Sequence, residues 1–119
     1  WLQVDLGYSR SIYAIDTMGN PNINMLVKTF KIEYREDGQL WKWYTLNGLT
    51  KIFDGNTQTD VVVRNYFDPP IAARFVKLYP LEHENYRCMR WELYTCLRKS
   101  SNWNNYTDRN RIEFLTRDA

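Results

Sequence analysis

Residues 1–7, WLQVDLG, decide the fold class of this chain. Leu2, Val4 and Leu6 alternate with polar residues, and Gly7 follows them. This two-residue period is typical of a strand with one buried face. The stretch begins at residue 1, with no Met and no leader before it. We therefore expect a β domain whose N-terminal segment is absent from this sequence.

Similar alternating runs recur along the chain, with turn residues between them. The further predicted strands cover residues 11–17, 27–35, 41–46, 51–53, 61–64, 72–78 and 88–96. The predicted breaks are residues 7–10, 19–24, 36–38, 47–48, 54–57, 68–70 and 82–85. Proline cannot donate to a strand ladder, so Pro69 and Pro70 are expected to end a strand. Roughly eight short strands and no helical period predict an all-β, antiparallel β-sandwich or barrel.

The composition limits the classes of function. The chain has 119 residues, of which 44% are hydrophobic and 16% aromatic, enough for the core of one domain. The net charge is +2, and the basic residues are scattered among acidic ones. This distribution lacks the basic stripe that nucleic-acid binding needs. No run approaches the roughly 18 apolar residues of a membrane span.

Two cysteines lie at the ends of one predicted strand. Cys88 and Cys96 are eight residues apart, which in a strand separates their Cα atoms by roughly 26 Å. A disulfide needs about 7 Å or less, so the two cannot pair with each other. They are either buried free thiols or partners of cysteines upstream of residue 1. The second alternative would place the protein outside the cell.

The character of the chain changes after Leu97. Residues 98–119 are mostly polar, with a few apolar residues among them. We therefore expect a domain over residues 1–97 and a linker or tail over 98–119. Asn105 begins a glycosylation sequon, which is used only in a secreted protein.

No set of residues predicts catalysis or a metal site. His83 is the only histidine, which argues against zinc. Asp5 and Glu92 are expected to accept hydrogen bonds from arginines on neighbouring strands rather than to transfer protons. Oxygen-bearing side chains at residues 54–60 could hold Ca²⁺, but their spacing falls short of a recognised loop. We therefore predict no cofactor.

The tryptophans could instead form a platform on which sugars stack. Trp41, Trp43 and Trp91 lie on predicted strands. Large aromatic side chains dominate protein cores, so we expect these three to be mostly buried.

Six motifs in order resemble the discoidin domain, also called the coagulation factor 5/8 C-type domain. They are WLQVDLG at 1–7, TMGN at 17–20, FKIEY and EDG within 30–38, GNT at 55–57, FDPPI and ARF within 67–75, and MRWELYTC at 89–96. Each motif is weak alone, but their order across residues 1–96 is specific. The resemblance implies an eight-stranded, jelly-roll-like antiparallel β-sandwich.

The resemblance also implies partners for both cysteines. Members of the family normally begin a few dozen residues before WLQVDLG, and that segment carries a cysteine that pairs with the one matching Cys96. Discoidin-domain receptors that bind collagen, and many invertebrate adhesion proteins, carry a second cysteine that pairs with the one matching Cys88. The family thus implies disulfides from Cys88 and Cys96 to cysteines absent from this chain.

Ligands in this family meet loops at one end of the sandwich, and one such loop matches residues 20–26. The binding residues that the resemblance implies are Asn20, Asn22, Ile23, Asn24, Met25, Leu26, His83 and Asn85. The apolar residues would insert or stack, and the amides would orient a polar ligand. The alternative is an ordinary connecting loop whose apolar residues fold back onto the core.

Two departures from the family pattern affect this site. Asn20 stands where the family usually has arginine, and His83 where it usually has tryptophan. The first puts in doubt a charge contact with acidic residues of a collagen-type partner. No basic residue follows in the loop until Lys28, so the apolar residues lack the adjacent cations that membrane-binding members generally show.

These observations predict a non-catalytic, extracellular recognition or cell-adhesion module. Its partner would be a protein, a glycan or a phospholipid headgroup. The alternative is an accessory carbohydrate-binding module of a secreted enzyme whose catalytic domain lies elsewhere in the parent chain. A hydrolase domain in that chain would favour the alternative, whereas a transmembrane helix with a kinase, or EGF-like repeats, would favour adhesion.

Overall fold

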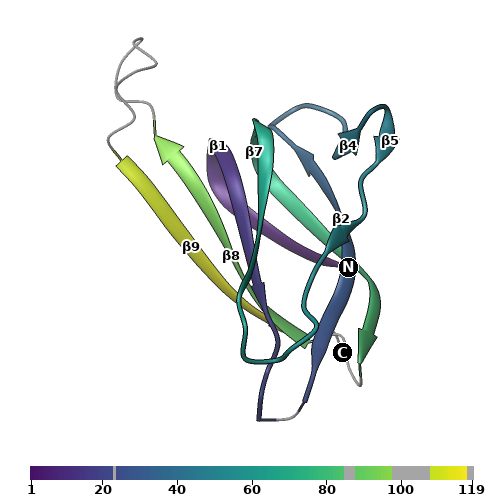
Figure 1. Cartoon of the computed structure of the whole chain (residues 1–119). Coiled ribbons are helices and arrows are strands. Elements are labelled where there is room, and N and C mark those ends of the chain that lie inside the picture. The colour runs from purple at the N-terminus through teal and green to yellow at the C-terminus, as the bar shows by residue number, and fades with distance from the viewer. Residues whose placement is uncertain (23, 85–87, 98–107, 118–119) are drawn as a thin grey trace.

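The computed structural model describes the backbone of residues 1–22, 24–84, 88–97 and 108–117, and the side chains of residues 1–22, 24–84 and 89–95. Within these ranges the chain forms strands and turns but no helix (Figure 1). The strands are β1 (Leu2–Met18), β2 (Leu26–Arg35), β3 (Lys42–Trp43), β4 (Thr45–Leu46), β5 (Leu49–Thr50), β6 (Phe53–Asp54), β7 (Val63–Glu84), β8 (Cys88–Leu97) and β9 (Asp108–Arg117).

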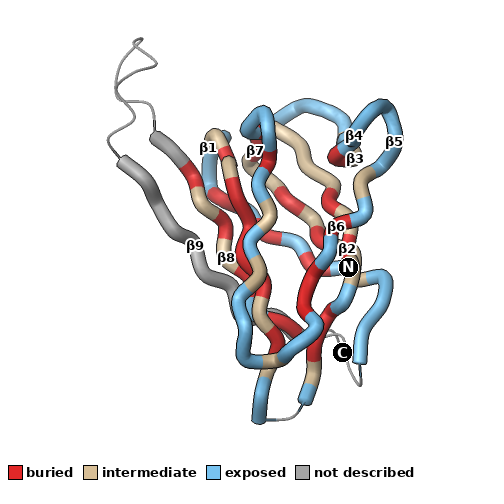
Figure 2. The backbone as a smooth tube through the Cα atoms, in the orientation of Figure 1, coloured by how far each residue is buried: buried red, intermediate tan, exposed pale blue. Residues whose placement is uncertain are grey.

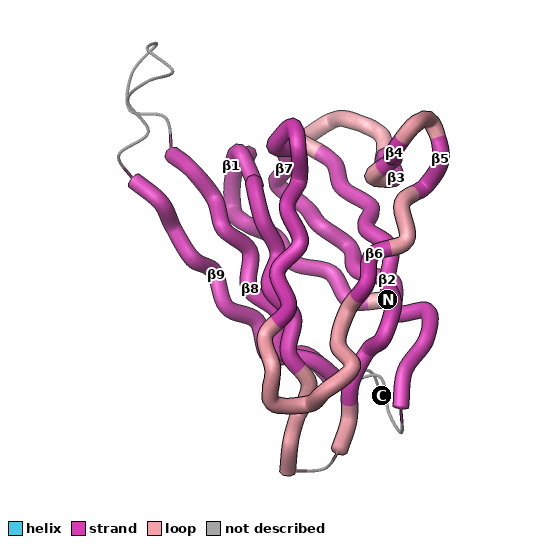
Figure 3. The backbone as a smooth tube through the Cα atoms, in the orientation of Figure 1, coloured by secondary structure: helices cyan, strands magenta, loops and turns pink. Residues whose placement is uncertain are grey.

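One antiparallel sheet holds most of these strands. Its order is β3-β2-β7-β1-β8-β9, and β6 pairs with β2, while β4 and β5 form a separate hairpin. The beginning of β1 pairs with the second half of β7, and the end of β1 pairs with the first half of β7. Both long strands therefore run through two layers, and β2 and β8 contact each other across the core without being paired. The predicted antiparallel β-sandwich is confirmed (Figure 3).

Two bulges let these long strands change layer, and both were predicted as strand ends. Between the pairs Asp5–Phe75 and Arg10–Ala73, four residues of β1 oppose one of β7. Between Ile12–Ile71 and Ala14–Tyr66, four residues of β7 oppose one of β1. The predicted break at residues 7–10 is therefore wrong, because the chain there bulges within one continuous strand.

The prolines also fail to end a strand. Pro69 and Pro70 lie inside the second bulge, where the ladder requires no backbone N–H from them. Strand β7 therefore continues from Val63 through both prolines to Glu84. It includes Glu82 and His83, which were predicted to lie in a loop.

The core lies between the two layers (Figure 2). Phe30 and Phe53 stack with ring centroids 5.2 Å apart, and Tyr44 and Phe67 pack against Phe53 at 5.4 and 5.8 Å. Trp91 enters from β8 and is fully buried. This aromatic cluster joins β2, β6 and β7 to the base of the β4–β5 hairpin.

Two of the three tryptophans predicted as core residues lie on the outer face of the sheet. Trp41 and Trp43 are half-buried there, and only Trp91 is in the core. The Nζ atom of Lys77 lies 4.0 Å from the Trp41 ring centroid, and that of Lys31 lies 4.4 Å from the Trp43 ring centroid. Lysine ammonium groups thus cover ring faces that a sugar would need for stacking.

Strand β9 was not predicted from the sequence. Residues Asp108–Arg117 pair with β8 along its whole length, from Leu97–Asp108 to Cys88–Arg117. Residues 112–115 carry apolar side chains between polar ones, a weak strand signal that the surrounding polar residues obscure. A domain boundary at residue 97 stays a prediction.

Arg74 holds the first bulge closed. Its Nε and Nη2 atoms donate to the two carboxylate oxygens of Asp5 at 2.8 and 3.0 Å, and Nη1 donates to Asp37 at 3.0 Å. The expected hydrogen bond from an arginine to Asp5 is confirmed. These donors, together with the Gly7 N–H, lower the pKa of Asp5 below its ordinary value of 3.8.

Replacing Phe53 tests the aromatic cluster. Phe53→Ala should lower the free energy of unfolding by about 3–5 kcal/mol, because it leaves a cavity among the three rings that pack against Phe53. The neighbouring Ile52 is about half exposed, so Ile52→Ala should change stability by only about 0.5 kcal/mol or less. Urea unfolding of both variants measures this, and equal losses would contradict the described core.

Replacing Arg74 tests the clamp at the bulge. In Arg74→Gln the pKa of Asp5 should rise toward 3.8 but stay somewhat below it, because the Gly7 N–H still donates. A carboxyl with a lowered pKa stabilises the fold above its unfolded-state pKa, and this contribution is lost as the pH falls through the folded-state pKa. The variant should therefore lose less stability on acidification. An NMR titration of Asp5 measures the shift, and an unchanged pKa would contradict the clamp.

Candidate binding site at the β1–β2 end

The loop between β1 and β2 is held by its own backbone. The Asn20 N–H donates to the Met25 carbonyl at 2.9 Å, and the Met25 N–H donates to the Asn20 carbonyl at 3.3 Å. The Asn22 N–H donates to Asn20 Oδ1 at 3.0 Å, which tightens the turn. A Cβ atom at Gly19 would collide with the Met25 carbonyl oxygen, so the close approach requires glycine there.

The predicted residues of this loop fall into different environments. Asn22 and Asn24 are exposed, whereas Asn20 and Met25 are half-buried. Leu26 is only 2% exposed and begins β2. Leu26 is therefore a core residue in this structure and not a contact for a ligand. The next residue, Val27, is buried as well, and the register of β2 against β7 shifts between Val27 and Phe30.

The end of β7 lies beside this loop. His83 is exposed and pairs in register with Val27, and Glu84 pairs with Leu26. Lys28 Nζ lies 3.1 Å from Glu84 Oε1, so the first basic residue after the loop is in an ion pair.

Several predicted positions lie outside the described residues. Ile23, Asn85 and Asn105 are among them. Cys88 and Cys96 lie near the two ends of β8, as the strand prediction required, but their side chains are outside the description. Their disulfides stay a prediction.

A cleft of about 230 Å³ adjoins the loop, and the sequence did not reveal it. It is lined by Met18, Gly19, Asn20, Pro21, Asn22, Met89 and Arg90. Met18 and Arg90 face each other across β1 and β8. Arg90 thus lines the same cleft as Asn20. Only the cross-strand register brings these two positions together.

The neighbouring loop, residues 55–62, is tied to the end of β1 by a buried asparagine. Asn56 Nδ2 donates to the carbonyls of Thr17 and Val61 at 2.9 and 2.8 Å, and the Asn56 N–H donates to Val27 at 2.9 Å. Asn56 is fully buried, so its side chain supports the loop from inside and does not point to a surface cation.

A polar network continues from the cleft along the outer face of β1 and β8. Arg64 donates to both oxygens of Asp16 at 2.7 and 3.0 Å. The Tyr94 hydroxyl lies 2.9 Å from Asp16 and 3.2 Å from Glu92. Burial, together with the hydrogen bond to Asp16, raises the pKa of Tyr94 above its ordinary value of 10.0. The network braces the strands next to the cleft.

The described residues include neither a metal-binding cluster nor a membrane-spanning helix. In this part of the chain no three His, Cys, Asp or Glu side chains gather in a way that could hold a metal ion. The same residues include no helix with the length and apolar character needed to cross a membrane.

The sequence profile of the F5/8 type C domain matches residues 1–93. This chain belongs to that family. The F5/8 type C fold also agrees with a solved structure, the wild-type discoidin II of Dictyostelium discoideum, at a TM-score of 0.75 and 28% identity. That match covers 84% of this chain and 38% of the discoidin II chain.

Relatives with F5/8 type C sequences are much longer proteins. The venom prothrombin activator pseutarin-C non-catalytic subunit of Pseudonaja textilis is 38% identical over 100 residues, which are 81% of this chain and 7% of that protein. Lactadherin of Rattus norvegicus is 35% identical over 98 residues, which are 81% of this chain and 23% of lactadherin. The chain thus spans a small part of each relative.

Replacing Asn56 tests the support beneath the site. Asn56→Ala should lower the free energy of unfolding by about 1–3 kcal/mol, because carbonyl groups at the loop base lose a buried donor. Asn65 also donates its amide to a backbone carbonyl, that of Asp54 at 2.9 Å, but at an exposed position. Asn65→Ala should therefore cost less than about 1 kcal/mol. Thermal unfolding of both variants measures the difference, and an equal cost would contradict the supporting role.

Proposed function

We propose that this chain is a non-catalytic extracellular recognition module that binds its ligand at the β1–β2 end. The observation that carries the proposal is the Asn20–Met25 bridge. It holds the exposed amides of Asn22 and Asn24 on a fixed base beside the cleft. A loop fixed before binding loses less conformational entropy when the ligand arrives.

The lining of the cleft supports a protein ligand over the other two classes. The amides of Asn20 and Asn22 can pair with peptide groups, and Met18 adapts its shape to apolar side chains. Arg90 matches a carboxylate, because a guanidinium group donates two parallel hydrogen bonds to it. We therefore favour an extended protein segment with an acidic side chain. Binding of a glycan or of a phospholipid headgroup in place of a protein would contradict this choice.

The relatives support the absence of catalysis and the extracellular location. One is named as a non-catalytic subunit of a venom activator. On this proposal Cys88 and Cys96 form disulfides with cysteines elsewhere in the parent chain, and Asn105 carries a glycan. The accessory carbohydrate-binding module of a secreted enzyme remains the second candidate, supported by the exposed amides at Asn22 and Asn24.

Two asparagines at opposite ends of the sandwich give a matched test. Asn24 and Asn47 are both exposed and have φ angles of 52° and 54°. Glycine adopts this conformation readily, so Asn24→Gly and Asn47→Gly each remove an amide without straining the backbone. Asn24→Gly should weaken ligand binding roughly five- to tenfold, the worth of one hydrogen bond, and Asn47→Gly should not.

The binding assay uses three probes in parallel: immobilised fibrillar collagen, a glycan array, and vesicles that contain phosphatidylserine. Binding to collagen that Asn24→Gly and Arg90→Gln both weaken supports a protein ligand. Glycan binding that depends on Asn24, with no response to collagen, would show that the ligand is a carbohydrate. Equal effects of Asn24→Gly and Asn47→Gly on every probe would contradict the proposed site.

A further inference from the structure

The sequence contains three places where an asparagine or aspartate directly precedes a glycine. At such a pair the backbone nitrogen of the glycine can attack the side-chain carbonyl carbon of the residue before it, because glycine has no side chain to hinder the approach. The attack closes a cyclic imide, a succinimide. The three pairs are Asp37–Gly38, Asn47–Gly48 and Asp54–Gly55. Which of them reacts depends on what holds the side chain and the glycine N–H group.

The fold holds both aspartate pairs. The two carboxylate oxygens of Asp37 accept hydrogen bonds from Nη1 of Arg74 at 3.0 Å. The Gly55 N–H donates to the Lys28 carbonyl at 2.7 Å, so its nitrogen is engaged by another strand and not by Asp54. An ionised carboxylate also resists attack by a nucleophile because it already carries negative charge. Neither aspartate pair is therefore arranged for ring closure.

The Asn47–Gly48 pair is exposed at the tip of the β4–β5 hairpin, at the end opposite the β1–β2 loop (Figure 2). Among the described residues, no hydrogen bond engages the Asn47 side chain. The two residues have φ angles of 54° and 80°, as a two-residue turn of type I′ requires. In such a turn the N–H of the second residue lies outside the strand ladder. Both reacting groups are thus open to solvent.

The hairpin is short enough to open at its tip. Its strands pair through Thr45–Thr50 and Leu46–Leu49 alone, and a ladder of this length is marginal in water. Ring closure requires the Asn47 side chain and the Gly48 nitrogen to rotate toward each other, which the closed turn restricts. Opening of the tip gives that freedom and breaks no core contact, because Leu46 and Leu49 are already 53% and 74% exposed.

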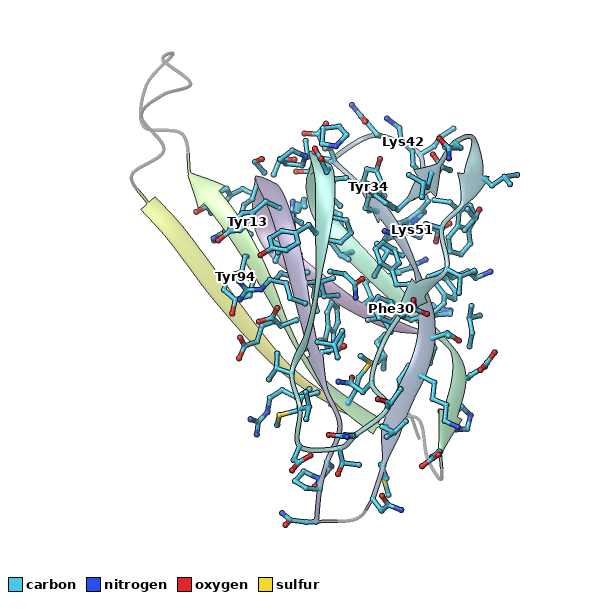
Figure 4. All side chains as sticks on the ribbon, in the orientation of Figure 1. Tyr13, Phe30, Tyr34, Lys42, Lys51 and Tyr94 are labelled. Carbon is cyan, nitrogen blue, oxygen red and sulfur yellow. The ribbon has the colours of Figure 1, made fainter. Side chains whose placement is uncertain are left out.

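The base of the hairpin is held independently of its tip. The Lys51 N–H donates to the Tyr44 carbonyl at 2.9 Å. The Tyr44 ring is buried against Phe53 and Phe67 at 5.4 and 5.1 Å. Lys42 and Lys51 mark where the chain enters and leaves this region (Figure 4). A chemical change at the tip therefore alters the hairpin and leaves the aromatic core in place.

We propose that Asn47 is a deamidation site of the folded protein. The Gly48 nitrogen forms a bond to Cγ of Asn47, and the side-chain amide group leaves as ammonia, which takes up the proton that the Gly48 nitrogen loses through solvent. Water then adds to one of the two carbonyl carbons of the succinimide and breaks its bond to the ring nitrogen. The products are aspartate and isoaspartate, and water is the only co-reactant.

Both products change the tip of the hairpin. Each places a carboxylate, and therefore one negative charge, in a turn that was neutral. Aspartate keeps the backbone and tolerates a positive φ as asparagine does. Isoaspartate carries the backbone through the former side chain and lengthens the turn by one carbon atom. The Leu46–Leu49 pair no longer fits a two-residue turn of this length, so the tip of the hairpin stays open.

Peptide mapping of the 119-residue chain tests the site. The folded chain is incubated at mildly alkaline pH, where the glycine nitrogen loses its proton more readily. It is then digested with trypsin at mildly acidic pH, where the reaction is slow. Residues 43–51 form one tryptic peptide, since Lys42 and Lys51 are its cleavage sites. This peptide should acquire the mass of the aspartate form and separate into two chromatographic peaks. A methyltransferase that recognises isoaspartate should label one of the two peaks.

Asn24 is the matched control within the same chain. It is exposed and has a φ angle of 52°, but Met25 follows it, and the Met25 N–H donates to the Asn20 carbonyl at 3.3 Å. Asn47 should therefore deamidate roughly tenfold faster than Asn24, because its neighbour is an unhindered and unengaged glycine. Asn47→Gly keeps the turn and removes the reacting amide, so isoaspartate labelling should fall to background.

Two results would overturn the proposal. The first is an Asn47 that stays intact in the folded chain but is converted in the urea-unfolded chain, because the fold would then protect the pair. The second is equal conversion at Asn24 and Asn47. The incubated chain should also keep its unfolding temperature and change its amide NMR shifts only around residues 45–50. A lowered unfolding temperature would contradict the separation of the hairpin tip from the core.

Discussion

The pairing of β1 with β7 is the constraint on which the rest of the structure depends. Each strand crosses from one layer to the other, and the two cross together, so the β1–β7 pairing contributes to both halves of the sandwich. The strands β2 and β8 do not pair with each other. They face each other because β2 pairs with β7, and β8 pairs with β1. The two bulges are what make this crossing possible, since an unbroken ladder of this length would give one long twisted sheet. Arg74, the single residue opposite the first bulge, ties it to Asp5 and Asp37.

This arrangement separates the molecule into two ends with different chemistry. At one end the same ladder delivers the β1–β2 loop next to the start of β8, which creates the cleft with Asn20 and Arg90. At the other end the aromatic core supports a hairpin whose leucines and lysines face solvent. On the outer faces between the ends, internal contacts such as Lys77 over Trp41 and Arg64 on Asp16 already engage charged side chains. These contacts favour our proposal that binding uses the loop at the β1–β2 end.

Much of the fold could be predicted from the sequence, because period-two alternation reports directly which face of a strand is buried. The errors have a common origin. Gly7 and Pro69 were interpreted by their local preference for turns, but in the fold they lie in bulges where the neighbouring strand supplies the continuity. Trp43 was expected inside because of its size, yet alternation places it outside, over a lysine. At the site, the loop position could be predicted from the motifs, whereas the cleft could not, because Arg90 reaches it only through the register of β1 and β8.

The central claim is that the ligand binds at the β1–β2 end of the sandwich. It is tested most directly by mapping the backbone amide NMR shifts of a ¹⁵N-labelled sample during titration with the ligand found by the probe assay. The account predicts that the ligand shifts the amides of Asn20, Asn22 and Asn24 but not those of Asn47 and Gly48, which lie in the turn at the opposite end. Equal shifts of both sets of amides, or shifts of the turn alone, would contradict it.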